Sequence, residues 1–149
     1  MVNFKLKALG ICDSALQLLT SYLSDRKQRV VIENRMSPLL NLNAGVPQGS
    51  ILGPLLFLIF QNDIETNIIS DISMFADDTS LLNIFSNLKE AESTINKDLA
   101  TLLSWSRSWM VKFNPLKTKF ILISNKKNRA NLNIFLDGKK ILKVKNNKH

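Results

Sequence analysis

Apolar residues recur at helical spacing in two segments of the chain. In residues 11–23 they lie three or four positions apart, and from Asn87 to about Val111 they form a single stripe. Glu90 follows Asn87 by three residues, the spacing of a capping box, so we expect the longest helix to begin there. The stripe of this helix consists of Leu88, Ala91, Ile95, Leu99, Leu102 and Trp109.

A third apolar segment predicts a buried helix over residues 53–62. Pro54 lies near its first turn, where the missing N–H does no harm. Just before it, three glycine or proline residues fall within residues 45–50, too densely for a regular element. The sequence therefore predicts a loop that leads into this helix.

Stretches rich in β-branched residues predict strands, two pairs of which flank polar turns. One hairpin joins residues 72–75 to residues 79–84, with Ala76–Asp78 at its tip. The other joins residues 133–136 to residues 139–144 through Asp137 and Gly138, a pair typical of type I′ turns. The remaining expected segments are strands at 27–33, 39–44 and 119–124, a turn at 34–38 and a charged connection at 126–131. This order of elements predicts an α+β fold, an antiparallel sheet packed on helices.

Length and composition are those of one intracellular domain. The chain has 149 residues, of which 45% are hydrophobic, enough to bury a core. Cys12 is its single cysteine, which excludes an intrachain disulfide and fits a reducing compartment, the nucleus or the cytoplasm. Residues 1–10 lack the pattern of a secretion signal, and the longest apolar run is too short to span a bilayer. We therefore expect a protein that is neither secreted nor bound in a membrane.

Positive charge is concentrated at the C-terminal end. The net charge is +8; residues 112–149 hold eleven Lys/Arg and one acid, or +10, whereas residues 1–111 contribute −2. A basic block of this kind is typical of surfaces that bind phosphate backbones. The alternative is a solvated, lysine-rich tail.

The candidate chemistry lies in the adjacent carboxylates of Asp77 and Asp78, at the expected hairpin tip. Neighbouring carboxylates repel one another unless a cation lies between them. Mg²⁺ binds in this way, through one or two carboxylates together with substrate phosphates. The pair therefore points to phosphoryl chemistry, although aspartates are also common in plain polar turns.

Two motifs in this order closely resemble the reverse transcriptases of non-LTR retrotransposons, the jockey/LINE-like RNA-directed DNA polymerases of mobile elements. They are GVPQGSILGPLLF at residues 45–57 and FADDT at residues 75–79. Trp105, followed by NPLKTK at residues 114–119, agrees with the family's pattern of a Trp ahead of Asn-x-x-Lys-Thr. The resemblance runs from about Phe4 to the end of the chain.

This resemblance implies a polymerase palm that adds deoxynucleotides to a DNA primer on an RNA template, with Mg²⁺ or Mn²⁺ as cofactor. Asp77 and Asp78 match the family's metal ligands, and Lys117 matches a cation near the departing pyrophosphate. The residues that match the nucleotide and template pocket are Pro47, Gln48, Gly49, Phe75 and Ala76.

Each of these residues also has a structural interpretation. Gln48 could belong to a plain loop, Lys117 could be one more surface lysine, and Phe75 could pack in the core on the inner face of its hairpin. Core packing is the better interpretation of Trp105 and Trp109, and a cap or surface acid that of Asp63. Two arginines, Arg26 and Arg29, could contact template phosphate or simply face solvent.

Relative to this family, residues 1–149 read as a partial palm domain cut at both ends. The family's other essential aspartate, the fingers before it and the thumb after it fall outside the matching segment. We therefore expect the isolated chain to be inactive or nearly so. The alternatives are a non-catalytic nucleic-acid-binding remnant of a retrotransposon and an unfolded product without function; the oligomeric state is unpredicted.

Overall fold

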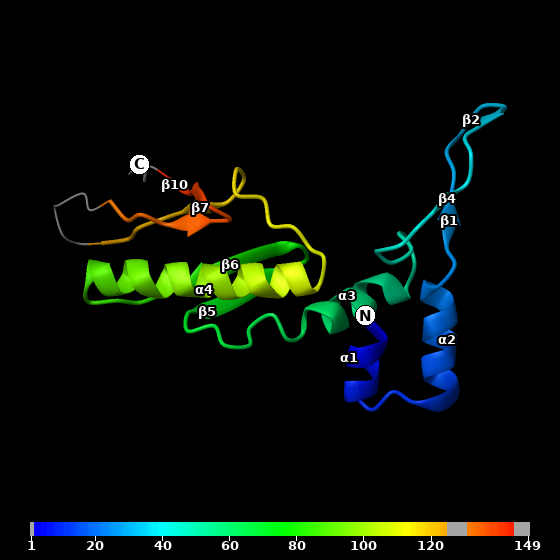
Figure 1. Ribbon diagram of the computed structural model, residues 1–149, viewed down its shortest axis with the longest axis horizontal. Coiled ribbons are helices and arrows are strands. Elements are labelled where there is room, and N and C mark those ends of the chain that lie inside the picture. Colours follow the sequence, from blue (N-terminus) through cyan, green and yellow to red (C-terminus); the bar gives the residue numbers. More distant parts are fainter. Residues whose placement is uncertain (1, 125–130, 145–149) are drawn as a thin grey trace. The chain divides into compact units, whose positions relative to one another are not determined.

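The computed structural model describes residues 2–124 and 131–144 (Figure 1). These residues form two compact units, which divide between Asp63 and Ile64. Within the described residues there are four helices and five two-stranded sheets. The fold is therefore mixed α+β, as predicted. The expected single antiparallel sheet is wrong, because the strands pair only two by two and one pair is parallel.

Three helices build the first unit: α1 (Val2–Ala8), α2 (Asp13–Leu23) and α3 (Leu52–Gln61). Leu6 and Leu56 are fully buried where α1 packs against α3. The predictions of α2 and α3 are confirmed to within two residues at each end. Helix α1 was not predicted, because its seven residues make only two turns, too few to display a helical period.

A two-stranded ribbon connects α2 to the loop before α3. Its base pairs β1 (Lys27–Gln28) with β4 (Leu40–Asn41), and its tip pairs β2 (Val31–Ile32) with β3 (Arg35–Met36). The predicted continuous strands at 27–33 and 39–44 and the turn at 34–38 are therefore wrong.

The break in the ribbon has a local cause. Pro38 has no N–H to donate to a ladder, and the Val30 N–H donates to the Ser37 hydroxyl at 2.9 Å rather than to a backbone carbonyl. The chain reverses at Glu33, whose φ is +53°, rather than across residues 34–38.

The second unit contains the best-formed hairpin and the longest helix. Strands β5 (Asp71–Phe75) and β6 (Asp78–Leu82) form five antiparallel pairs. Helix α4 (Leu88–Ser108) begins as predicted after Asn87, whose side chain accepts the Lys89 N–H at 3.0 Å. It ends at Ser108, three residues earlier than the expected end at about Val111.

Four short strands complete this unit: β7 (Lys119–Phe120), β8 (Phe135–Leu136), β9 (Lys139–Lys140) and β10 (Leu142–Lys143). The β8–β9 hairpin is confirmed, and both of its turn residues, Asp137 and Gly138, have the positive φ of a type I′ turn.

The strand predicted at 139–144 is wrong, because it breaks at the buried Ile141 and β10 then pairs in parallel with β7. The strand predicted at 119–124 keeps only its first two residues. The connection predicted at 126–131 lies, except for Asn131, outside the described residues.

The core of the second unit lies between α4, the β8–β9 hairpin and one face of β5–β6. Asn96 on α4 fixes the position of β8 like a neighbouring strand: its amide donates to the Asn133 carbonyl at 2.8 Å and accepts the Phe135 N–H at 2.9 Å. Ile72 and Leu81 of the β5–β6 hairpin pack against this core. Its buried members are Ile64, Leu99, Leu102, Leu132, Ile134, Leu136 and Ile141.

Candidate metal and nucleotide site

The predicted metal ligands lie at the tip of the β5–β6 hairpin. Ala76 and Asp77 form the two-residue turn, and Phe75 pairs with Asp78 across it. The expected tip of residues 76–78 is corrected by one residue, since Asp78 already begins β6. Ala76 has φ of +52°, a left-handed conformation that costs about 1 kcal/mol for a residue with a Cβ. This turn is therefore under backbone strain beside the two carboxylates.

Strand register decides which side chains accompany the carboxylates. Neighbouring residues of a strand point to opposite faces, so Phe75 and Asp78 lie on the face away from Ile72 and Leu81. Phe75 is 84% exposed, and the interpretation of its ring as a core residue is wrong. The whole outer face is exposed: Asp71, Ser73, Phe75, Asp78, Ser80 and Leu82.

The donor set at the tip fits one class of ion. Asp77 and Asp78 are both exposed and offer hard carboxylate oxygens, with room for water and phosphate to complete the coordination. Within residues 2–124 and 131–144 no group of three or more His, Cys, Asp or Glu side chains could hold a metal ion. The chain thus offers a pair of ligands of the kind that Mg²⁺ or Mn²⁺ shares with a substrate.

Asp98 attaches the base of this hairpin to α4, and sequence reasoning missed it. Its side chain is fully buried; Oδ1 accepts the Ile69 N–H and Oδ2 the Ser70 N–H, both at 2.9 Å. The signal was present in the sequence, because Asp98 falls three residues after Ile95 and four before Leu102, on the apolar stripe of α4. A carboxylate on such a stripe must find buried hydrogen-bond donors.

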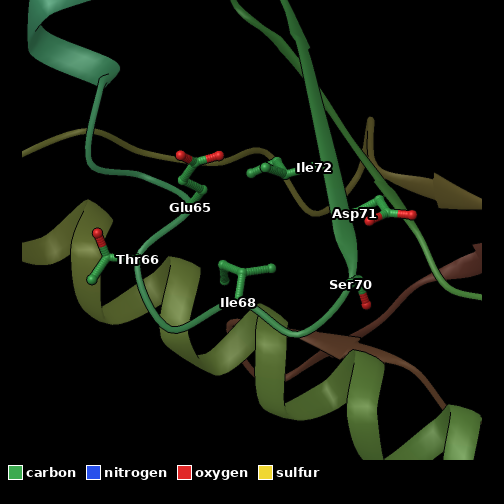
Figure 2. Close-up of a pocket in the computed structure, with 6 residues that line it drawn as sticks. All are labelled: Glu65, Thr66, Ile68, Ser70, Asp71 and Ile72. Atoms are coloured by element: carbon green, nitrogen blue, oxygen red, sulfur yellow. The ribbon is translucent and has the colours of Figure 1, made fainter.

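A shallow hollow of about 560 Å³ lies beside the same base, where the chain enters β5 (Figure 2). Its two carboxylates, on Glu65 and Asp71, point in different directions and do not converge on one point. Asp77 and Asp78 are at the other end of the strands and do not line it. The lining residues are Glu65, Thr66, Ile68, Ser70, Asp71 and Ile72.

The predicted pocket loop is shaped by contacts with α3. Gln48 and Gly49 form an exposed turn, with Gly49 at φ +77°. Ser50 donates its hydroxyl to the Pro47 carbonyl at 2.7 Å and accepts the Gly53 N–H at 3.1 Å. A Cβ on Gly53 would lie 3.1 Å from the Ser50 hydroxyl oxygen, so glycine lets the loop lie against the helix.

Arg26 holds the other end of this loop. Its guanidinium donates to the carbonyls of Leu23 at 3.2 Å, Ala44 at 3.1 Å and Gly45. Arg26 is therefore not a plain solvated side chain, and its contact with template phosphate stays a prediction. Arg29 is exposed on the ribbon.

Lys117 lies in a turn that Asn114 organises. The Asn114 side chain accepts the Leu116 N–H at 3.0 Å, and its carbonyl accepts the Thr118 N–H at 3.0 Å. These bonds explain why Asn and Thr bracket the lysine, whose side chain is exposed. Lys117 thus lies in the second unit, in a turn between α4 and β7, whereas Asp77 and Asp78 lie at the tip of the β5–β6 hairpin.

The remaining candidates have structural roles. Trp105 packs against the core, as expected, and its ring centroid lies 6.5 Å from that of Trp109. Asp63 lies at the surface, with its side chain 40% exposed, and it forms a 2.6 Å ion pair with the buried Lys5. Lys5 could not have been placed from the sequence, since α1 itself was not predicted.

Comparison with known families matches residues 3–145 to the family described as reverse transcriptase (RNA-dependent DNA polymerase). The chain is 38% identical over 109 residues to the probable RNA-directed DNA polymerase from transposon BS of Drosophila melanogaster, which covers 68% of the chain. It is 30% identical over 130 residues, 82% of the chain, to the RNA-directed DNA polymerase from mobile element jockey of Drosophila funebris. The jockey protein of Drosophila melanogaster is 29% identical over 117 residues, 73% of the chain.

The matching segments span 12%, 14% and 13% of these three relatives, respectively, so the chain corresponds to a small part of each. No solved structure matches the chain significantly. No helix among the described residues is long and apolar enough to cross a membrane.

Proposed function

Because this chain belongs to the reverse transcriptase family, we propose that it forms the palm region of a mobile-element polymerase that copies RNA into DNA. The observation that carries the proposal is the pair of exposed carboxylates, Asp77 and Asp78, at the tip of a hairpin whose base is fixed to α4. Fixed strands with exposed ligands at one end suit a site that must hold its substrate in register.

Each carboxylate has a proposed role in holding Mg²⁺ or Mn²⁺. Asp77, in the turn, is the principal ligand, and Asp78, at the start of β6, is its partner. When bound, divalent ions stabilise the attacking and leaving oxygens of phosphoryl transfer. The chain's own contribution is to present two adjacent exposed carboxylates, one in the strained turn and one at the start of β6.

The remaining predicted residues would bind the nucleic acid and the nucleotide. Phe75 presents an exposed ring to a base or sugar on the same face as Asp78, next to Ala76 in the turn. Gln48 offers an amide donor and acceptor from the exposed turn after Pro47, and Gly49 lets a ligand approach the backbone closely. Lys117 would neutralise charge on the departing pyrophosphate.

A titration of the folded chain with Mn²⁺, followed by electron paramagnetic resonance, tests the metal site. We expect Asp77→Asn to weaken binding at least about tenfold, because removing one of two carboxylates halves the charge of the ligand set. Asp71→Asn is the matched control, since Asp71 is exposed on the same face at the far end of the hairpin. Equal binding by wild type and Asp77→Asn would refute the proposal.

A second candidate, a non-catalytic nucleic-acid-binding domain, is favoured by the surface after α4. Asp137 is the single acid among described residues 112–144, and it pairs with Arg107 at 3.2 Å. Exposed lysines therefore dominate this surface: Lys112, Lys117, Lys119, Lys139 and Lys140.

The dependence of RNA binding on Asp77 and on Mn²⁺ separates the two candidates. A non-catalytic binder would keep its affinity for single-stranded RNA after Asp77→Asn, and log K would fall with log[salt] by roughly 0.7 per phosphate contacted. Exchanging Lys139 and Lys140 for Gln should then reduce that slope. RNA affinity that depends on Mn²⁺ and on Asp77 would favour the polymerase site instead.

A further inference from the structure

The hairpin that carries Asp77 and Asp78 is fastened at its open end by one buried side chain. We propose that Asp98 is a positioning residue, which sets the orientation of β5–β6 on α4 and thereby the place of both carboxylates. The inference rests on the proposed function for its consequence, but the attachment itself is a feature of the fold.

The first support is the way in which Asp98 is buried. A carboxylate without solvent is strongly destabilising unless charge-assisted hydrogen bonds compensate for lost hydration. Both oxygens of Asp98 accept backbone N–H groups, from Ile69 and Ser70, the two residues immediately before β5. The Asp98 carboxylate is therefore bonded to the two residues through which the chain enters the hairpin.

A second contact joins the other strand to the same point. The Asn83 amide, immediately after β6, donates to the Ser70 hydroxyl at 3.3 Å, and Ser70 is itself buried. Both ends of the hairpin thus belong to one hydrogen-bond network centred on Asp98. The tip, with Ala76 and Asp77, is exposed, and no comparable attachment to it is found among residues 2–124 and 131–144.

Strand length makes the base important for the tip. Five residues at about 3.4 Å each span about 17 Å, so a rotation of 5° at the base would move the tip by roughly 1.5 Å. Displacements of roughly this size reduce catalytic rates by about two orders of magnitude when reacting groups must be aligned. Asp98 would therefore influence the metal site without touching a metal ion.

Residue-resolved amide hydrogen exchange on the 149-residue chain tests this role. Asp98→Asn keeps one acceptor oxygen but turns an NH₂ group toward the second backbone N–H. We expect the amides of β5 and β6 to exchange about tenfold faster or more, since a buried charged hydrogen bond is lost. The amides of α4 and β8 should keep their protection. Lys97→Ala, at the exposed neighbouring position on α4, is the matched control and should change neither set.

Two results would overturn the proposal: unchanged exchange in the hairpin, or an equal acceleration of β5–β6, α4 and β8, which would indicate a general loss of stability. If Asp98→Asn does not fold, Asn83→Ala cuts only the link between Ser70 and the end of β6 and should accelerate the hairpin alone. Equal exchange in that variant and in wild type would equally contradict the proposal.

Metal binding separates this inference from the proposed function. In Asp98→Asn, Mn²⁺ affinity should fall several-fold although Asp77 and Asp78 are intact. Selective acceleration of hairpin exchange, in a protein whose wild type binds no Mn²⁺, would refute the proposed metal site and still confirm Asp98 as the anchor of the hairpin.

Discussion

Phe75 and Asp78 face each other as the last cross-strand pair of β5–β6, so an aromatic ring and a carboxylate emerge together on the solvent side of the sheet. Exposing a ring of this size forgoes about 2 kcal/mol of burial free energy. In the proposed site, this exposed ring would be available to contact a base or sugar beside Asp78.

Phe75→Ala should change the free energy of unfolding by less than about 0.5 kcal/mol, because the ring contributes little to the core. Leu136→Ala, at a position only 2% exposed, should lower the same free energy by about 2–5 kcal/mol. Urea denaturation of both variants measures the two values. A loss of several kcal/mol in Phe75→Ala would show that the ring packs in the folded protein.

Asp63→Asn should destabilise the first unit by about 1–3 kcal/mol, because it removes the carboxylate that pairs with the buried Lys5 ammonium. Adding Lys5→Met should restore part of the loss, since the buried charge then disappears with its partner. Thermal unfolding of the single and double variants measures this coupling. Additive effects of the two substitutions would contradict a direct interaction between them.

A Gly→Ala substitution inside a helix usually stabilises it by up to about 1 kcal/mol, and Gly53→Ala should stabilise α3 by less than this. The new Cβ would lie 3.1 Å from the Ser50 hydroxyl oxygen and 3.4 Å from the Pro47 carbonyl oxygen. In a Ser50→Ala background the first of these contacts is gone, and the same substitution should become more favourable. A double-mutant cycle measured by urea denaturation tests this, and a coupling of zero would exclude the proposed contact.

Local patterns were sufficient for the elements whose signals lie within a few residues. The Asn87 cap and the Asp137–Gly138 turn depend on neighbours along the chain, and both are confirmed. The stripe of α4 is confirmed from Ala91 to Leu102, whereas Leu88 is exposed and Trp109 follows the end of the helix. The β5–β6 hairpin was found for the same reason, but its tip was misplaced by one residue. That single residue decides that Asp78 lies in a strand, which the dipeptide alone does not reveal.

Elements that depend on distant partners were not predictable in the same way. Strand β10 pairs with β7, more than twenty residues earlier, and this parallel register leaves no local pattern. The ribbon was predicted in outline, but the effect of Pro38 on its ladder was not recognised.

The candidate site shows the same division. Its metal ligands were found from a motif, whereas Asp98 and Arg26 act through backbone atoms that only the folded chain brings near them.

Asn96 and Asp98 are two residues apart on α4. Asn96 hydrogen-bonds to β8, and Asp98 hydrogen-bonds to the residues that precede β5. The hairpin that carries the β9 lysines and the hairpin that carries Asp77 and Asp78 are consequently both attached to one helix, α4. If the chain binds nucleic acid as proposed, both surfaces would meet it while attached to the same helix.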